Sequence, residues 1–248
     1  MSTEKKVAFI TGANRGIGFE TARELGEKGI TVILGSRDPS KGQEATEKLK
    51  KAGISAISFK FDINDPSDHK EIFAYLEKNF GKLDILINNA GVWLDSQPGD
   101  GKNRTSSTSQ EILRKTFDAN FFNLVALTQT LLPLIKKSPD GRIVNLSSIL
   151  GSLTTHTDPK STIYEFKAFA YNASKTALNA FTVHLAHELK NTKIKVNSAH
   201  PGWIKTELGG PAAPLDVSEG GKTSVQLALL PENGPSGGFF HLGDPIPW

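Results

Sequence analysis

The chain has 248 residues, 38% of them hydrophobic and 22% charged, with a formal net charge of +3 and no cysteine. This length can bury a full core, and the small, evenly mixed charge excludes a strongly basic nucleic-acid-binding surface. The lack of cysteine excludes disulfides, thiolate chemistry and cysteine-ligated metals, and we expect no metal site of any kind.

The N-terminal residues 1–6 carry no apolar stretch of the signal-peptide kind and lead into the short apolar run Val7–Ile10. This run predicts a buried strand. No apolar stretch approaches the roughly 20 residues needed to span a bilayer. We therefore expect a cytoplasmic protein that does not contact membranes.

A glycine-rich turn follows the first strand, with Gly12, Gly16 and Gly18 placed before a helical pattern over residues 19–28. Such a turn lets the backbone approach a phosphate, and the free N–H groups and positive dipole end of the helix hold the anion. The spacing differs from the usual Gly-x-Gly-x2-Gly pattern, and a plain tight loop is the alternative. The position between first strand and first helix favours a nucleotide site.

The second apolar run, residues 31–34, ends in Gly35, Ser36 and Arg37. At this place a carboxylate would bind a ribose 2′-hydroxyl, whereas an arginine accommodates a 2′-phosphate. Arg37, together with Arg15 in the glycine turn, favours NADP(H). Asp38 leaves two possibilities open, because its carboxylate either repels that phosphate or caps the helix that begins near Pro39.

Strands and helices alternate along the rest of the chain. Expected helices cover residues 39–52, 65–80, 108–134, 170–189 and 218–230, and expected strands cover 54–61, 83–87, 142–146, 194–199 and 238–242. The helix over residues 65–80 is expected to begin with Asp65 as its cap and to stop at Gly81. This alternation predicts a parallel sheet of one domain over residues 1–248, with ligands bound at the carboxyl ends of the strands. Residues 95–107 are expected to form a polar loop, Thr108–Glu111 a capping box, and residues 203–221 a lid.

Tyr171 and Lys175 lie four residues apart in a predicted helix and therefore share one of its faces. An ammonium beside a phenol favours the phenolate, so we expect the pKa of Tyr171 to fall below its usual value of about 10. Tyr171 would then exchange a proton near neutral pH. Taken alone, such a pair is more typical of a solvated helix face than of a catalytic site. Asn120, in the middle of a predicted helix, is either a satisfied core group or a functional one.

Taken together, these motifs resemble the short-chain dehydrogenase/reductase family over essentially the full length. The resemblance is carried by Thr11-Gly12-x3-Gly16-x-Gly18, Asn88-Asn89-Ala90-Gly91, Asn120, Ser148, Tyr171-x3-Lys175 and Pro201-Gly202-x3-Thr206. It implies a single-domain α/β protein with a doubly wound Rossmann fold. The expected sheet is seven-stranded and mostly parallel, with helices on both faces, and the expected cofactor is NADPH or NADP+.

The resemblance also implies roles. Tyr171 would be the acid/base, Ser148 the hydrogen-bond donor to the substrate oxygen, with Ser147 as the fallback, Lys175 the ligand of the nicotinamide ribose, and Asn120 the backbone holder of a relay water. The implied cofactor-binding residues are Gly12, Asn14, Arg15, Gly16, Ile17, Gly18, Arg37, Asp62, Ile63, Asn89, Ala90, Gly91, Tyr171, Lys175, Pro201, Gly202, Ile204 and Thr206. Among these, Asp62 and Ile63 would flank the adenine, Asn89 its ribose, and Thr206 the carboxamide. The expected substrate-binding residues are Ser148, Trp93, Tyr171, Trp203 and Leu208.

One departure concerns residues 149–170, which make the interval between Ser148 and Tyr171 longer than is common in the family. This resembles monomeric carbonyl reductases and related plant ketone reductases, in which an insert blocks the usual dimer face, and it predicts a monomer. The expected activity is NADPH-dependent reduction of a ketone or aldehyde to an alcohol. The alternatives are reduction of an activated C=C bond and NADP(H) sensing without turnover.

Overall fold

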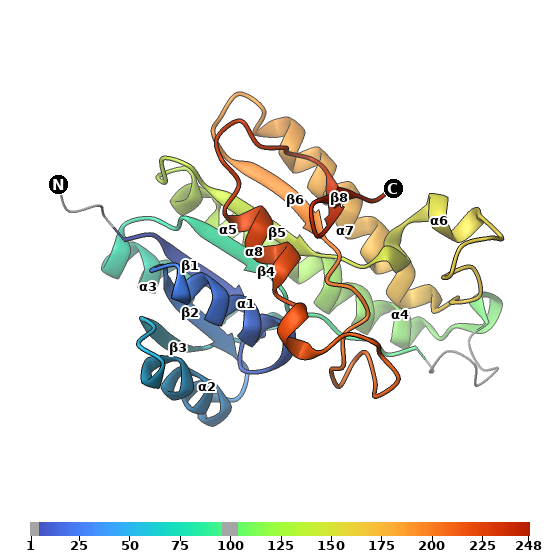
Figure 1. The fold of residues 1–248 in the computed structure, drawn as a ribbon, viewed down its shortest axis with the longest axis horizontal. Helices are drawn as coiled ribbons and strands as arrows, with labels where there is room; N and C mark the ends of the chain where they lie inside the picture. The colour runs from blue at the N-terminus through green and yellow to red at the C-terminus, as the bar shows by residue number, and fades with distance from the viewer. Residues whose placement is uncertain (1–4, 96–103) are drawn as a thin grey trace.

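The computed structural model describes residues 5–95 and 104–248, which fold around one eight-stranded sheet (Figure 1). The strand order is β3-β2-β1-β4-β5-β6-β7-β8. All neighbouring strands pair in parallel except β7 and β8. The strands are β1 Val7–Thr11, β2 Thr31–Ser36, β3 Ala56–Lys60, β4 Ile85–Asn88, β5 Arg142–Leu146, β6 Lys195–Ala199, β7 Phe239–His241 and β8 Asp244–Pro245.

Helices cover both faces of this sheet. The α-helices are α1 Gly16–Glu27, α2 Pro39–Lys51, α3 Pro66–Phe80, α4 Gln110–Phe117, α5 Asn123–Ile135, α6 Leu153–Thr157, α7 Phe169–Glu188 and α8 Lys222–Ala228. One buried cluster joins the sheet to α1, α2 and α8, and a second joins its other face to α3, α5 and α7. The expected doubly wound fold is therefore confirmed.

The first strand shows how the sequence produces these two layers. All residues of β1 are buried, as expected for a parallel strand covered on both faces. Side chains alternate across a strand. Phe9 accordingly joins the cluster of α3, α5 and α7, whereas Ala8 and Ile10 join the cluster of α1, α2 and α8.

Three details of the expected architecture were wrong. The sheet has an eighth strand in place of the expected seven, because the two residues of β8 turn back and pair with β7. A strand of two residues is too short to show alternation. The long helix expected over residues 108–134 is interrupted by a π-turn, Asp118–Phe122, and its cap is Ser109, whose hydroxyl accepts from the N–H of Ile112, and not Thr108.

The caps of the second and third helices agree with the sequence. Asp38 accepts hydrogen bonds from the N–H groups of Ser40 and Lys41, which shows that its carboxylate caps α2. Asp65 caps α3, and Gly81 ends that helix in the left-handed conformation, with φ of 68°. Of the loop expected over residues 95–107, residues 96–103 lie outside the described part of the chain.

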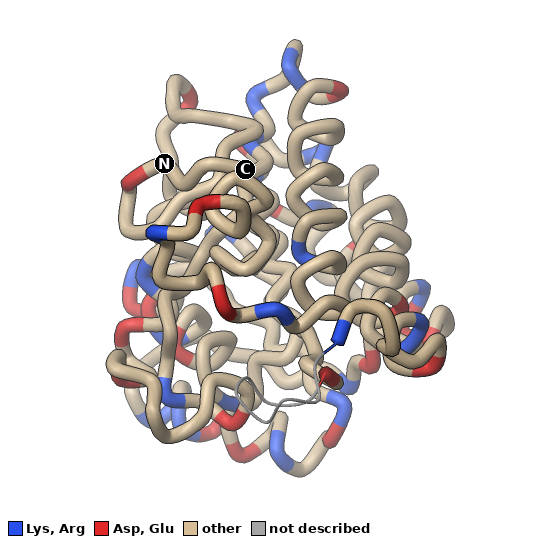
Figure 2. Tube along the Cα trace, turned by 90° about the vertical axis from the view of Figure 1, so that its right-hand side faces the viewer, with Lys and Arg blue, Asp and Glu red and all other residues tan. Residues whose placement is uncertain are grey.

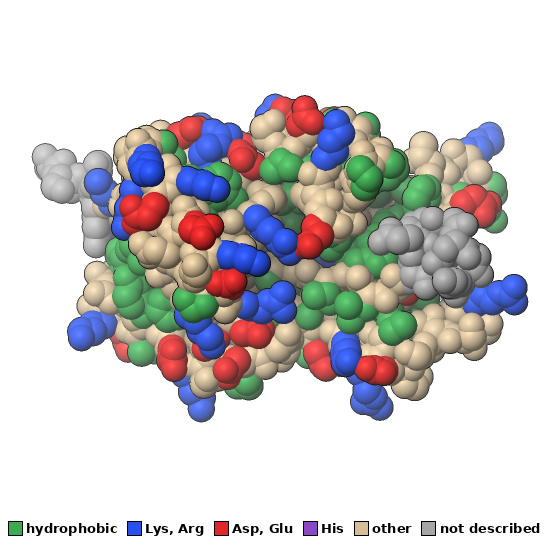
Figure 3. Space-filling view, turned by 90° about the horizontal axis from the view of Figure 1, so that it is seen from below, with side chains coloured by type: hydrophobic (Ala, Val, Ile, Leu, Met, Phe, Trp, Pro, Cys, Tyr) green, Lys and Arg blue, Asp and Glu red, His purple; other side chains and the backbone are tan. Residues whose placement is uncertain are grey.

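The charged residues are mixed over the surface. Figure 2 shows Lys and Arg among Asp and Glu around the molecule. Seen from below, the surface has acidic and basic side chains next to each other, and hydrophobic side chains beside a furrow in the right half (Figure 3). Within residues 5–95 and 104–248, no helix combines the length and apolar character that a membrane span needs.

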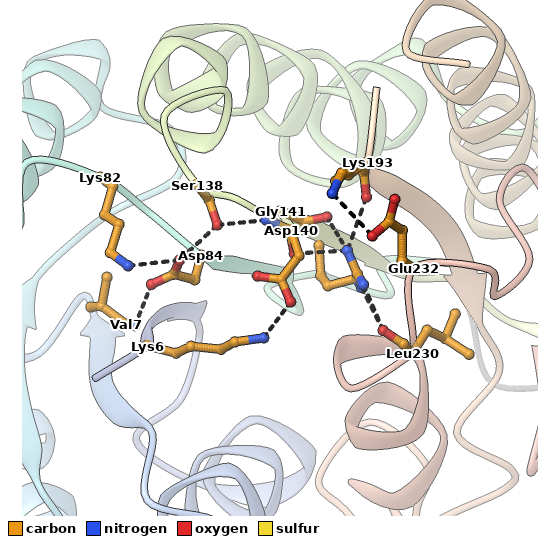
Figure 4. A network of polar contacts seen from close by, with 11 residues as sticks. Lys6, Val7, Lys82, Asp84, Ser138, Asp140, Gly141, Lys193, Leu230 and Glu232 are labelled. Atoms are coloured by element: carbon orange, nitrogen blue, oxygen red, sulfur yellow. Dashed lines mark hydrogen bonds and ion pairs between the residues drawn. The ribbon is translucent and has the colours of Figure 1, made fainter. Parts of the chain in front are cut away.

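A polar network ties the amino ends of the central strands together (Figure 4). The buried carboxylate of Asp84 accepts from the N–H of Val7 at 2.9 Å and from the hydroxyl of Ser138 at 2.6 Å, and Lys82 lies 3.3 Å from it. Nearby, the buried guanidinium of Arg142 donates to four backbone carbonyls. The amino ends of the strands lie opposite their carboxyl ends, where ligands bind in such folds.

We expect Asp84→Asn to lower the free energy of unfolding by about 2 kcal/mol, because hydrogen bonds to a charged group are lost and the new amide N–H faces donors. Chemical denaturation measures this change. Lys6→Ala is the control, since the partly exposed ion pair of Lys6 with Asp140 contributes only about 0–1 kcal/mol. Equal stability of Asp84→Asn and the wild type would contradict a structural role for this network.

Candidate active site

The glycine turn between β1 and α1 has a backbone that only glycine adopts easily. Gly12 and Gly16 have φ of 64° and 58°, in the left-handed region. A Cβ on Gly18 would lie 2.5 Å from the amide nitrogen of Asn89 and 2.6 Å from the carbonyl oxygen of Gly12. Any larger residue at position 18 would thus push the turn away from the strand ends.

The end of β4 holds this turn in place. The side-chain amide of Asn89 donates to the carbonyls of Thr11 at 2.7 Å and Gly12 at 3.1 Å. In return, the hydroxyl of Thr11 accepts from the N–H groups of Asn89 and Ala90. Asn89 therefore shapes the turn with its amide, in addition to the ribose contact expected for it.

The beginning of α1 suits an anion. Arg15 is the cap residue, but its side chain makes no capping hydrogen bond, and the first turn of the helix has no acidic residue. Arg15 forms an ion pair with Glu207, and both side chains are exposed. Arg37 is exposed at the end of β2. The uncapped helix, the glycine cradle and these two guanidiniums fit a dinucleotide that carries an additional phosphate.

Two further groups of expected cofactor residues flank the turn. Next to β3, the N–H of Asp62 donates to the buried carboxylate of Asp68, and Ile63 is buried. On the other side, a Cβ on Gly16 would lie 3.5 Å from the methyl carbon of Thr206, and Ile204 is buried. The remaining expected residues in these segments are Asn14 in the turn, Ile17 in the first turn of α1, and Pro201 and Gly202 after β6.

The four expected catalytic residues come together at the carboxyl ends of β4 and β5. The phenol of Tyr171 is hydrogen-bonded to Ser148, and the Lys175 ammonium lies 5.6 Å from the centre of its ring. A Cβ on Gly91 would lie 3.6 Å from the Lys175 nitrogen and 3.3 Å from the Asn120 side-chain oxygen. The ammonium of Lys175 also donates to the carbonyl of Leu146, at 2.7 Å.

Asn120 lies in the π-turn, a distortion that is frequent at functional sites. Its fully buried amide accepts from the N–H of Val92 and donates to the carbonyl of Val92 and the hydroxyl of Ser174. The side chain therefore links the segment after β4 to α7. The backbone role expected for Asn120 stays a prediction.

The expected fall in the pKa of Tyr171 was wrong. Burial raises the pKa of this phenol to about 12, and the hydrogen bond with Ser148 offsets only part of that effect. Burial lowers the pKa of Lys175 to about 8, because the charged ammonium loses water. In the cofactor-free protein, desolvation thus outweighs the attraction between the ammonium and a phenolate.

The pKa of Lys175 predicts a change of stability with pH. Between pH 8 and about 10.4, the unfolded chain keeps a proton on Lys175 that the folded chain has released, so the free energy of unfolding rises with pH. Tyr171 stays protonated in both states below pH 10. From pH 7.5 to 9.5 we expect wild type to gain about 2 kcal/mol relative to Lys175→Met, measured by chemical denaturation. A constant difference between the two proteins would contradict the lowered pKa.

Among the expected substrate residues, Trp93 lies directly against Tyr171. Its indole is stacked on the Tyr171 ring, with centroids 4.6 Å apart and an interplanar angle of 24°. Trp203 packs edge to face against Phe166 at 6.4 Å, so the lid segment 203–221 meets the insert of residues 149–170 there. Trp203 and Leu208 are both exposed. No contact among the described residues joins either of them to Tyr171 or Ser148.

Sequence reasoning missed three residues that support this site. Asp95 accepts from the backbone N–H of Tyr171, and Ser174 lies between Asn120 and the carbonyl of Tyr171. His200 accepts from the N–H of Ile149, and burial, followed by the proximity of His241, lowers its pKa to about 3. None belongs to a spaced motif, and only the position of His200 directly before Pro201-Gly202 gave a signal.

Comparisons with known proteins agree with this geometry. A family model described as short chain dehydrogenase matches residues 6–214. Salutaridine reductase of Papaver bracteatum is 33% identical over 98% of this chain and 96% of its own length. Carbonyl reductase (NADPH) 1 of Mus musculus is 32% identical over 100% of both chains. The structure of NADPH-bound carbonyl reductase from chicken fatty liver superposes with a TM-score of 0.84 at 25% identity, over 99% of this chain and 95% of that one. The chain belongs to the short chain dehydrogenase family of oxidoreductases.

Proposed function

We propose that the protein is an NADPH-dependent reductase that converts a ketone or aldehyde to an alcohol. The observation that carries this proposal is the buried Tyr171, whose phenol is hydrogen-bonded to Ser148 and whose ring centre lies 5.6 Å from the ammonium of Lys175. A hydroxyl donor, a second hydroxyl and a cation at one point suit a carbonyl oxygen that gains negative charge. The relatives named as carbonyl reductases support the same reaction.

NADPH fits the residues around the glycine turn. The pyrophosphate would lie against the uncapped N-terminus of α1, with Gly12, Gly16 and Gly18 allowing close approach. Arg15 and Arg37 would hold the 2′-phosphate, and Lys175 would bind the nicotinamide ribose, as the family resemblance implies. When bound, NADPH supplies the hydride that reduces the carbonyl carbon.

The chain's own residues then donate the proton and stabilise the charge that develops. Because the pKa of Tyr171 is raised, the phenol carries its proton at neutral pH and donates it to the substrate oxygen. Ser148 already accepts from the N–H of Leu150, which leaves its own O–H to donate to the same oxygen. The phenolate that remains on Tyr171 is stabilised by the ammonium of Lys175, which is charged below about pH 8.

The substrate we propose is apolar or aromatic. Trp93 on Tyr171, and Trp203 against Phe166, place aromatic surface on the segment after β4, on the lid segment and on the insert. Binding sites for small molecules combine such apolar walls with a few placed polar groups. Closure of the lid segment 203–221 would exclude water from Ser148 and Tyr171.

The proposed state in solution is a monomer. The insert of residues 149–170 lies along α7, where Thr176 donates to the carbonyl of Gly151 and Asn172 donates to the carbonyl of Phe166. The insert therefore covers part of the helix that would otherwise meet a second copy. Light scattering during size-exclusion chromatography should give the mass of one chain, and a stable dimer would contradict the proposal.

The test is to follow NADPH and NADH oxidation with a panel of aldehydes, ketones, diketones and enones and to identify every product. We expect alcohols, formed faster with NADPH than with NADH. Formation of a saturated ketone from an enone would contradict the proposed carbonyl reduction and show that the protein reduces the C=C bond. Tight NADPH binding without turnover of any compound would contradict an enzymatic function and favour NADP(H) sensing.

A further inference from the structure

Helix α7, which carries the catalytic residues, begins without a cap of its own. The residue before it is Ala168, whose side chain cannot accept a hydrogen bond, and the first turn contains no acidic residue. The first N–H groups of a helix have no partner within it, and a side-chain oxygen usually satisfies those of the second and third residues. In α7 these residues are Ala170 and Tyr171.

Asp95 supplies the missing cap from 75 residues away in the chain. One carboxylate oxygen accepts from the N–H of Ala170 at 3.1 Å, and the other accepts from the N–H of Tyr171 at 2.9 Å. The side chain is almost completely buried, with 9% of the residue exposed. A negative charge at this end of the helix is also favoured by the helix dipole. One buried carboxylate thus holds the first turn of the helix, with one oxygen on Ala170 and the other on the N–H of the proposed proton donor, Tyr171.

Asp95 belongs to the short segment after β4, residues 92–95, and this segment holds Tyr171 at two other points. Trp93 is stacked on its ring, and Val92 is bound through both its N–H and its carbonyl to Asn120. Asn120 in turn donates to the hydroxyl of Ser174, which donates to the carbonyl of Tyr171. The backbone N–H, the backbone carbonyl and the ring of Tyr171 are therefore all tied to the segment after β4.

We propose that Asp95 is a positioning residue, which sets the place of the Tyr171 phenol for proton transfer by fixing the start of α7. A displacement of a catalytic group by about 1 Å can lower a rate by about 100-fold. The hydrogen bonds of Asp95 to α7 therefore affect turnover, although Asp95 touches no reacting atom. This inference rests on the proposed function, in which Tyr171 donates the proton. It also makes the orientation of Tyr171 depend on the segment that follows Gly91.

The experiment compares Asp95→Ala and Asp95→Asn with the wild type by two independent measurements. Hydrogen exchange of the Ala170 and Tyr171 amides in the cofactor-free protein reports the cap, whatever reaction the protein catalyses. Steady-state kinetics on a carbonyl that the wild type reduces report its consequence. We expect Asp95→Ala to lose protection at both amides and to lower kcat by about 10–100-fold, with the KM for NADPH nearly unchanged.

Asp95→Asn keeps one acceptor oxygen, so it should restore protection at one amide and recover part of kcat. Asp65→Ala is the matched control. It removes the carboxylate that caps α3, at the N–H of Ser67, and should cost about 1 kcal/mol of stability without changing kcat. A kcat loss in Asp65→Ala equal to that in Asp95→Ala would show a general effect of stability and would overturn the proposal.

Two other results separate the inference from the proposed function. Unchanged protection in Asp95→Ala, or lost protection with full kcat, would overturn the positioning role. Failure of the wild type to reduce any carbonyl would instead overturn the proposed reaction, and with it the catalytic part of this inference. Hydrogen exchange would still decide whether Asp95 holds Tyr171.

Discussion

Tyr171→Phe should lower kcat by about 10²–10⁴-fold and leave the dissociation constant of NADPH nearly unchanged. The substitution removes only the hydroxyl, so the ring can keep its stacking contact with Trp93 and the backbone can keep its bonds to Asp95. Since the raised pKa keeps the phenol protonated, the hydroxyl is the proton source in the proposed reaction. Stopped-flow measurement of NADPH oxidation and fluorescence titration of NADPH give the two constants.

Tyr75→Phe is the matched control for this prediction. Tyr75 lies on α3 and packs between Phe59 of β3 and Phe80, on the face of the sheet that α3 covers. Its hydroxyl belongs to none of the proposed catalytic or cofactor-binding residues. Its loss should leave kcat unchanged. A rate for Tyr171→Phe near that of the wild type would show that another group donates the proton, for which Ser148, hydrogen-bonded to the phenol, is the candidate.

The fold could be predicted from sequence where the signals are local. Apolar runs that end in glycine or polar residues marked β1, β2 and β5, and Asp65 with Gly81 marked the two ends of α3. These signals work because a buried parallel strand needs continuous apolar residues, and because caps act within one turn. The two-residue strand β8 and the π-turn at Asn120 have no such local signal.

The arrangement of the site was predictable only in part. From the residues alone, Tyr171 and Lys175 share a helix face and Ser148 follows a strand, and it is the family resemblance that joined the three into one group. It gave the wrong direction for the pKa of Tyr171, because the degree of burial depends on residues far apart in the chain, with Trp93 covering the ring. For the same reason Asp95, one acid in a polar stretch, gave no sign of capping α7.

The cofactor preference can be tested at Arg15 and Arg37, which the structure places in different surroundings. Arg37 is exposed at the end of β2, whereas Arg15 forms an ion pair with Glu207 of the lid segment. An exposed ion pair contributes about 0–1 kcal/mol, less than the charge-assisted bonds that a phosphate offers an arginine. We therefore expect a 2′-phosphate to displace Glu207 from Arg15.

Arg37→Ala should raise the KM for NADPH by about 10–100-fold and leave the KM for NADH nearly unchanged, because NADH lacks the phosphate that Arg37 binds. Glu207→Gln should change the KM for NADPH in the opposite direction. We expect it to lower this KM by about two- to fivefold, since the substitution frees Arg15 from its ion pair. Arg23→Ala is the control, because Arg23 also carries a guanidinium but pairs with Glu20 and Glu27 on α1. Equal effects of Arg37→Ala on both cofactors would place the 2′-phosphate away from β2. Arg15 would then have to provide the discrimination alone, and Glu207 would regulate it directly.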